Sequence, residues 1–352
     1  MRANLVTGAS DCDPSAVVTS LQVGASTGFS LIWMFPLTTL ALIWLDGRAA
    51  RIASRHGVGI SRHLRLRMGP IPAVVISAAF IAANAITIAA DISGAASVAS
   101  NLLGLPRWAM VLAIPVVPAA LLYKFDFAAV RRALLLVVPL FGLYLVAAIA
   151  SRPNPEWSEL FPHEVSWVLM LGAVGLVGSV LTPYVFFWQV EDSIQLRSRS
   201  PEEKGSSSAG MVLANLILLA IVVMAASVLY TPARSGFQVD NLRQASAALE
   251  PLLGRAAFAC FGIGLIASTV VGTPVIAAVC GYAAIGTTGR RAGLNWPVSA
   301  ARGFYGVAFG VLLLGSVLAL SGFNPVGMLL WAQIINGALL PVLVLILVFS
   351  TR

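Results

Sequence analysis

Three carboxylates lie within long apolar stretches of this sequence, where an acidic side chain is unusual. Asp11 and Asp13 stand in S-D-C-D-P-S, and Asp91 stands in N-A-I-T-I-A-A-D-I-S. An ionised carboxylate is costly to place in a membrane, so it normally faces a cavity, a partner or an ion. The same stretches contain no lysine or arginine that could pair with them. A bound cation is therefore the partner that this pattern favours.

The composition indicates a membrane protein built from helices. The chain has 352 residues, of which 59% are hydrophobic and 10% charged, whereas soluble domains carry about 25% charged residues. The apolar runs are continuous rather than alternating, which favours helices over a barrel. The net charge of +8 does not indicate nucleic-acid binding, because the basic residues stand in the loops between apolar runs. We predict an all-α, multi-pass membrane protein with one transmembrane domain over residues 1–352.

Apolar segments near the roughly 20 residues needed to cross a bilayer recur along the whole chain. We predict ten of them, at 4–24, 28–46, 71–103, 107–123, 130–150, 165–190, 209–230, 255–286, 302–320 and 324–350. If both termini are cytoplasmic, 17 of the 22 basic residues fall on the cytoplasmic side. This asymmetry is the one that the positive-inside rule predicts.

Two prolines divide the chain into matching halves. Pro14 follows Asp13 in the first segment, and Pro183 follows Thr182 in the sixth. Each proline removes a backbone donor and disfavours helix in the residue before it. Interrupted helices at matching positions are typical of transporters built from inverted repeats, here 1–150 and 165–350. Unwound carbonyls and half-helix ends at such breaks can bind cations; the alternative is a simple proline kink.

Further polar residues lie deep in two other segments. Asn84 and Thr87 share one helix face with Asp91, and Gln333 and Asn336 stand within one turn in W-A-Q-I-I-N-G. Hydrogen bonding between packed helices is the alternative explanation for Asn84, Thr87 and Asn336. We find no Walker loop and no H-E-x-x-H sequence, so an enzyme is not predicted.

The first of these stretches, T-G-A-S-D-C-D-P-S-A, resembles the first helix of the NRAMP family of divalent-metal transporters, whose hallmark there is D-P-G-N. G-S-V-L-T-P-Y, A-A-D-I-S-G and A-Q-I-I-N-G-A-L-L-P also resemble their counterparts, in the same order. The resemblance implies a LeuT-type fold of two inverted five-helix repeats, with helices 1 and 6 broken. It also implies an integral protein of the bacterial inner membrane.

The resemblance assigns roles to particular residues. Asp13 matches the metal-binding aspartate, and Ser10 and Ser179 fall where the family offers backbone carbonyls. Gln333 matches a glutamine that can approach the ion, and Asp91 matches an aspartate of the family's proton route. The metal is the substrate, and no cofactor is implied.

The sequence also departs from the family's pattern. Ala16 replaces the motif asparagine, Thr182 the methionine and Tyr184 a histidine; Gln189 and Gly94 replace a further histidine and a glutamate. Oxygen ligands suit magnesium, calcium or manganese, whereas thioethers suit softer metals. This pattern resembles the NRAMP-related, magnesium-type branch. Because the histidines and the glutamate are replaced, the sequence leaves open whether transport is coupled to protons.

Four residues are predicted to act beside the ion or on a proton route. They are Asp11, Asp91, Asn84 and Tyr184. For Asp11, attraction of ions, direct ligation and pairing all stay open. The predicted function is secondary transport of divalent cations of the Mn²⁺, Mg²⁺ and Fe²⁺ class by alternating access. The alternatives are a cation-coupled transporter of a small organic solute and a membrane sensor without transport.

Overall fold

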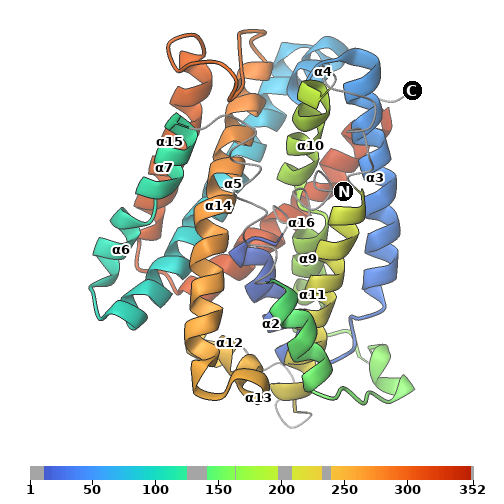
Figure 1. Ribbon diagram of the computed structural model, residues 1–352. Helices are drawn as coiled ribbons and strands as arrows, with labels where there is room; N and C mark the ends of the chain where they lie inside the picture. Colours follow the sequence, from blue (N-terminus) through green and yellow to red (C-terminus); the bar gives the residue numbers. More distant parts are fainter. Residues whose placement is uncertain (1–11, 125–140, 163, 197–207, 232–238, 350–352) are drawn as a thin grey trace.

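The computed structural model describes residues 12–124, 141–162, 164–196, 208–231 and 239–349. Within these ranges the regular structure is helical, and no strand is assigned. The all-α prediction is therefore confirmed for this part of the chain (Figure 1).

The helices follow the predicted order. Those before residue 151 are α2 (Pro14–Thr27), α3 (Met34–His56), α4 (Ile60–Met68), α5 (Pro70–Leu103), α6 (Arg107–Ala113), α7 (Val116–Lys124) and the segment Phe141–Ala150. Those after it are the 3-10 turn η1 (Trp157–Leu160), α9 (Trp167–Val180), α10 (Pro183–Leu196), α11 (Ser208–Val228), α12 (Leu242–Ser246), α13 (Glu250–Leu253), α14 (Ala257–Gly286), α15 (Arg302–Ala319) and α16 (Pro325–Phe349). The short 3-10 turns η4 (Ala247–Leu249) and η5 (Gly254–Ala256) flank α13.

Seven helices of the described ranges are long and apolar enough to cross a membrane. They are Pro70–Leu103, Arg107–Lys124, Trp167–Glu191, Gly210–Val228, Leu242–Gly286, Arg302–Ala319 and Pro325–Val348. Each corresponds to one of the ten predicted segments. The other three contain α2, α3 and Phe141–Ala150, and their crossing of the membrane stays a prediction.

One predicted boundary was wrong. The segment predicted at 28–46 becomes helical only at Met34 and continues through charged residues to His56. Residues 28–33 form turns, starting at Gly28 with a positive φ of 59°. Gly57, in the left-handed conformation with φ 63°, ends the helix. Hydropathy marked only the apolar part of α3, since alanine and arginine favour helix without making a stretch strongly apolar.

Both predicted helix breaks lie next to helix starts. α9 ends at Val180 and α10 begins at Pro183, so Leu181 and Thr182 are not helical. α2 begins at Pro14, with Asp13 as its N-cap. Proline suits the first position of a helix because the missing N–H would have no partner there. Each proline therefore begins a helix after non-helical residues rather than kinking a continuous one.

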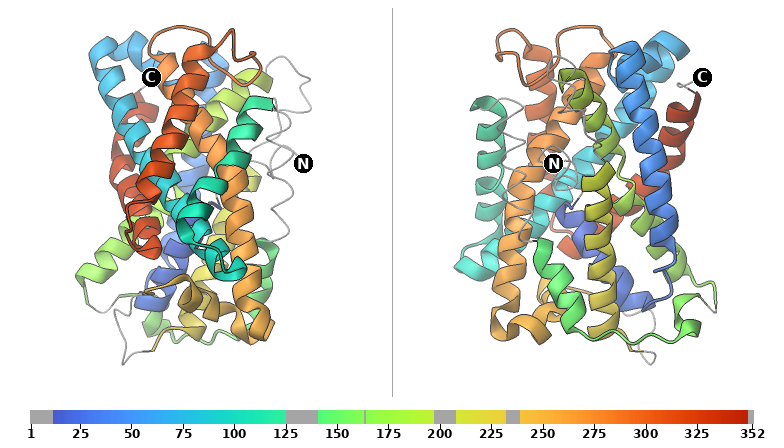
Figure 2. Two further views of the ribbon diagram at one scale, coloured as in Figure 1. Left: turned by 90° about the vertical axis from the view of Figure 1, so that its left-hand side faces the viewer. Right: turned by 45° about the vertical axis from the view of Figure 1, so that its right-hand side comes forward.

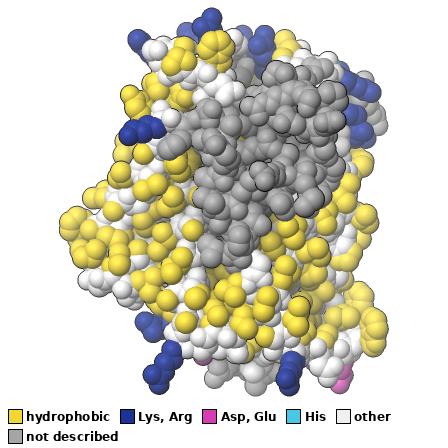
Figure 3. Space-filling view, in the orientation of Figure 1, with side chains coloured by type: hydrophobic (Ala, Val, Ile, Leu, Met, Phe, Trp, Pro, Cys, Tyr) yellow, Lys and Arg dark blue, Asp and Glu magenta, His cyan; other side chains and the backbone are white. Residues whose placement is uncertain are grey.

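The half-helix α2 lies in the protein interior. All of its residues are buried, and it packs against α9, α11 and α16, with further contacts to α5 (Figures 1 and 2). In the space-filling view an apolar belt separates two ends that carry basic side chains (Figure 3). The broken helix is thus held at the centre of a protein whose outer surface suits a bilayer.

Candidate functional site

The amino-terminal turn of α2 is completed by Asp13. The N-cap has extended backbone, with φ −72° and ψ 164°, and its Oδ1 accepts a hydrogen bond of 2.7 Å from the Ala16 amide. The carbonyl of Asp13 accepts from the Val17 amide at 3.1 Å. An aspartate at this position is a strong cap, because it satisfies amides that have no partner within the helix.

Asp91 of α5 binds the same turn from another side. Its Oδ1 accepts from the Ser15 hydroxyl at 2.5 Å and from the Ser15 amide at 3.2 Å. Pro14 has no amide hydrogen, so every amide of the first turn is accounted for. Two carboxylates thus meet the positive end of one helix dipole, which favours negative charge there. The sequence analysis did not single out Ser15; its place directly after Asp-Pro was the available signal.

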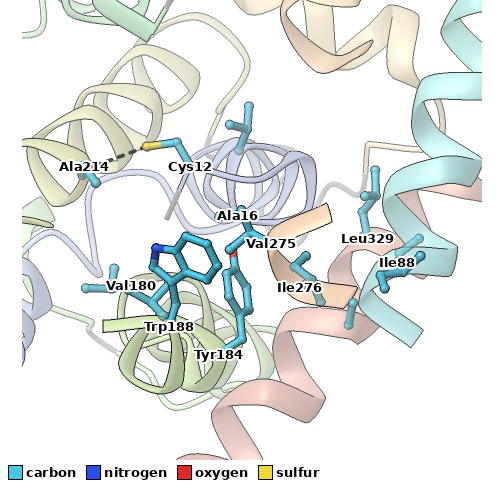
Figure 4. Packing of buried hydrophobic residues seen from close by; sticks show 14 of the residues in the cluster. Cys12, Ala16, Ile88, Val180, Tyr184, Trp188, Ala214, Val275, Ile276 and Leu329 are labelled. Carbon is cyan, nitrogen blue, oxygen red and sulfur yellow. Dashed lines mark hydrogen bonds between the residues drawn. The ribbon is translucent and has the colours of Figure 1, made fainter. Parts of the chain in front are cut away.

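Two further helices bring side chains onto Asp13. The Gln333 amide of α16 donates to Oδ1 at 3.1 Å, and the Tyr184 hydroxyl of α10 donates to Oδ2 at 3.1 Å. In Figure 4 the Tyr184 ring points from α10 toward Ala16 of α2. Tyr184 was predicted to act beside the ion; its hydroxyl contacts the carboxylate itself. Asp13, Gln333 and Tyr184 are therefore brought together by three helices.

Hydrogen bonds between polar side chains connect Gln333 to Thr87 of α5 through Asn336. The Asn336 amide donates to Gln333 Oε1 at 3.4 Å and to Thr87 Oγ1 at 3.3 Å. Asn84 behaves differently, because its amide donates to the Phe80 carbonyl of its own helix at 2.8 Å. Its Oδ1 is buried without a hydrogen-bond partner in the described structure. Within the described ranges no hydrogen bond joins Asn84 to Asp13 or Asp91, and its predicted role stays a prediction.

The side chains of Thr182 and Ser179 turn back onto α9. The Thr182 hydroxyl donates to the carbonyls of Gly178 and Ser179 at 3.0 and 3.1 Å, and the Ser179 hydroxyl donates to Gly175 at 2.9 Å. The single Thr182 hydrogen is thus committed to α9, while its oxygen keeps lone pairs. Ligation of an ion by these residues stays a prediction. Ser10 and Asp11 lie outside the described residues.

α14 supplies two supports that the sequence analysis missed. The Ser268 hydroxyl donates to the Cys12 carbonyl at 2.8 Å, and the Thr269 hydroxyl donates to the Asp91 carbonyl at 3.3 Å. The Cys12 thiol itself points to the Ala214 carbonyl of α11, at 4.0 Å (Figure 4). The adjacent Ser-Thr pair inside an apolar segment was the sequence signal. Ser268 thus holds the backbone just before α2, and Thr269 holds the backbone of α5 at Asp91.

The site places two acidic side chains in an apolar interior. Asp13 is 2% exposed and Asp91 is fully buried, and within the described ranges neither contacts a lysine, arginine or histidine. Asp91 Oδ2 has no hydrogen-bond partner there. Burying an ionised carboxylate without a counter-charge is strongly unfavourable. The arrangement is suited to hold a cation, which would supply the missing positive charge.

The donor set of this site is oxygen-rich. Among the described residues, no three of the types His, Cys, Asp and Glu gather closely enough to hold a metal ion by themselves. A cation here would therefore combine carboxylate oxygens with backbone carbonyl, amide or hydroxyl oxygens. Such ligands suit hard divalent cations.

Ser15→Ala tests how the two carboxylates are positioned. We expect it to destabilise the protein by about 1–3 kcal/mol, because Asp91 loses its hydroxyl donor while remaining buried. Thermal unfolding in detergent measures the effect. Ser227→Ala is the matched control, since the Ser227 hydroxyl donates only to the Val223 carbonyl of its own helix. Equal losses in both variants would contradict the assigned role.

Comparison with known proteins agrees with the geometry. The profile of the family described as Nramp, natural resistance-associated macrophage protein-like, matches residues 4–352. The protein named divalent metal cation transporter MntH of Aeromonas hydrophila is 30% identical over 284 residues, covering 74% of this chain and 68% of the relative. The protein of the same name from Acidiphilium cryptum is 27% identical, with coverage of 97% and 79%.

A solved structure shows the same fold. The manganese transporter of Eremococcus coleocola, solved with an aromatic bis-isothiourea substituted compound, superposes with a TM-score of 0.62. The match covers 98% of this chain and 77% of that protein, at 18% sequence identity. The predicted LeuT-type architecture is confirmed by this likeness.

Proposed function

This chain belongs to the Nramp family, and we propose that it carries divalent metal cations across a membrane by alternating access around Asp13. One observation carries the proposal. A buried carboxylate stands at the break of α2, is held by Gln333 and Tyr184, and has no cationic partner in the described structure. The relatives named above are divalent metal cation transporters by name. They give no support to the organic-solute alternative.

We propose that a bound ion takes the place of the groups that donate hydrogen bonds to the Asp13 carboxylate in this structure. Gln333 can turn its amide oxygen toward a cation, as an amide carries both a donor and an acceptor. The carbonyls of Ser10 and Ser179 and the Thr182 oxygen complete the proposed ligands, with Asp11, Asn84 and Asp91 adding negative or polar groups nearby. The metal is the cargo, and no resident cofactor is part of the proposal.

The proposed preference is for hard cations such as Mn²⁺ and Mg²⁺. Thr182→Met adds a soft thioether, so we expect the affinity for Cd²⁺ relative to Mg²⁺ to rise about tenfold, or about 1.4 kcal/mol. Competition calorimetry on the purified protein measures the ratio. Thr182→Val removes the hydroxyl without adding sulfur and is the matched control. An unchanged ratio in Thr182→Met would exclude position 182 as a determinant of metal choice.

Uptake by reconstituted liposomes tests the proposed function. Proteoliposomes loaded with a Mn²⁺- or Mg²⁺-sensitive dye are expected to show saturable uptake that empty liposomes lack. A pH-sensitive dye in parallel reports whether protons move with the metal. Absence of flux for every divalent cation tried, with correctly folded protein, would reject the proposal and favour a sensor role.

We further propose the predicted placement in the cell. The basic residues gather in the loops assigned to the cytoplasmic side, which favours two cytoplasmic termini in a bacterial inner membrane. The five-helix repeats are proposed to span 1–150 and 165–350. Accessibility of single cysteines placed in the α3–α4 loop and near Arg152 tests the orientation, because only the outward-facing position reacts with an impermeant reagent.

A further inference from the structure

An apolar groove lies where α5, α10 and α16 meet. Its volume is about 240 Å³ and its lining is apolar throughout. The floor is formed by Pro183 and by Phe80 and Phe187, whose rings stack with centroids 4.1 Å apart. On the rim, Val75 is 61% exposed and Val342 is 41% exposed. The groove therefore opens on the outer surface of the protein and reaches inward to the break between α9 and α10.

The groove runs toward one end of the bundle. The start of α5 and the end of α16 lie at that end, as both views of Figure 2 show. Val75 stands five residues after Pro70, the first residue of α5, which corresponds to about 8 Å along the helix axis. On α16, Ile346 of the lining lies close to the helix end at Phe349. The groove thus extends from the middle of the bundle to within a few residues of the start of α5 and the end of α16.

Two arginines stand near this end of the groove. Arg67 is exposed on α4, three residues before α5 begins. On α3, the Arg48 guanidinium donates to the Val348 carbonyl at 3.4 Å, two residues beyond the groove residue Ile346. Arg48 also lies 4.8 Å from the ring centre of Trp44, which is 45% exposed. A tryptophan beside an arginine on an outer face is typical of the level of lipid headgroups.

We propose that this groove binds an anionic phospholipid, with one acyl chain in the apolar groove and the phosphate between Arg48 and Arg67. Three observations carry this assignment to a lipid. The groove opens on the belt that faces hydrocarbon, it is apolar along its length, and Arg48 and Arg67 stand near the end where a headgroup would lie. Guanidinium groups bind phosphate through paired hydrogen bonds, and juxtamembrane basic residues attract anionic lipids.

The lipid would also act on transport, an effect that rests on the proposed function. Its acyl chain would pack on Pro183, the first residue of the half-helix that carries Tyr184 and hence the hydroxyl bound to Asp13. A rearrangement of α10 during alternating access changes the shape of this groove. A lipid in the groove therefore favours the position of α10 seen in this structure. The anionic-lipid content of the membrane then changes the transport rate.

Lipid binding is measured directly by native mass spectrometry. The purified full chain is exchanged into detergent containing either phosphatidylglycerol or phosphatidylcholine. We expect one phosphatidylglycerol to be retained per chain and phosphatidylcholine to be retained at least tenfold less. Ala79→Phe fills the groove and is expected to lose the lipid, whereas Ala78→Phe, on the neighbouring exposed residue outside the lining, keeps it. Arg67→Gln is expected to weaken retention at least fivefold, and Arg62→Gln, on the same helix, is its control.

The outcomes separate this proposal from the transport function. Equal retention of the two lipids, or unchanged retention in both Ala79→Phe and Arg67→Gln, would overturn the lipid site. Retention of detergent alone would overturn it as well. Metal uptake is then compared in liposomes with and without phosphatidylglycerol, where we expect at least a twofold difference for the wild type and none for Ala79→Phe. Retained lipid without metal flux in any liposome would reject the transport proposal and leave the lipid site standing.

Discussion

Replacing Asp13 with alanine is expected to abolish saturable metal uptake and to weaken divalent-cation binding roughly 100-fold, or about 2.7 kcal/mol. Asp13 is the carboxylate on which α2, α10 and α16 converge, through Ala16, Tyr184 and Gln333. Its loss removes both the negative charge and the acceptor to which Ala16, Tyr184 and Gln333 donate hydrogen bonds. Calorimetric titration with Mn²⁺ and liposome uptake measure the two effects.

Asp13→Asn separates the charge from the helix cap. Asparagine caps a helix about as well as aspartate, so we expect Asp13→Asn to fold normally and still to lose metal binding. Asp240→Asn, at an exposed acidic residue, is the matched control for a general effect of charge. Wild-type uptake by Asp13→Ala would show that the ion binds elsewhere.

Gly178→Ala is expected to have the largest effect on the fold around the site. A Cβ atom at Gly178 would overlap the Gln333 carbonyl and the Gly337 amide, and one at Gly337 would overlap the Val174 carbonyl. α9 and α16 thus contact each other through backbone atoms, so no side chain there can change its conformation to make room. We expect destabilisation by about 3 kcal/mol, as the helices must separate. We also expect weaker metal binding, because Gln333 moves away from Asp13.

Gly310→Ala is the matched control for this close contact. A Cβ atom at Gly310 of α15 would meet no atom within 4 Å. Alanine there should leave stability unchanged or raise it by up to about 1 kcal/mol, since alanine favours helix over glycine. Thermal unfolding midpoints of the two variants, measured in one detergent, test the contrast. Similar midpoints for both would show that α9 and α16 can separate without cost.

Much of the architecture could be predicted because membrane helices are specified locally. Hydropathy located the seven long apolar helices, and Pro14 and Pro183 located the two breaks. Each of these features depends on a few consecutive residues and on backbone chemistry that a neighbour cannot change. The end of α3 escaped prediction because the helix continues beyond its apolar part to His56.

The partners of the candidate site residues could be predicted only in part. Asp13 and Gln333 were singled out, but their contact joins residues 320 positions apart. Tyr184 was expected beside the ion, and its direct bond to Asp13 depends on how α10 rotates against α2. Ser15, Ser268 and Thr269 look like ordinary small polar residues in the sequence. Their roles arise from the helices that they face.

The sequence by itself determined that this is a helical membrane protein, that Pro14 and Pro183 disturb the helix at matching positions, and that a carboxylate precedes the first of them. These properties follow from side-chain hydropathy and from the missing proline amide, which act within a few residues. Only the tertiary structure decided that Asp91 binds the first turn of α2 through Ser15, and that Tyr184 and Gln333 donate to Asp13. Hydrogen bonds between distant segments depend on the rotation and spacing of packed helices, and those are set by the close contacts of the whole bundle.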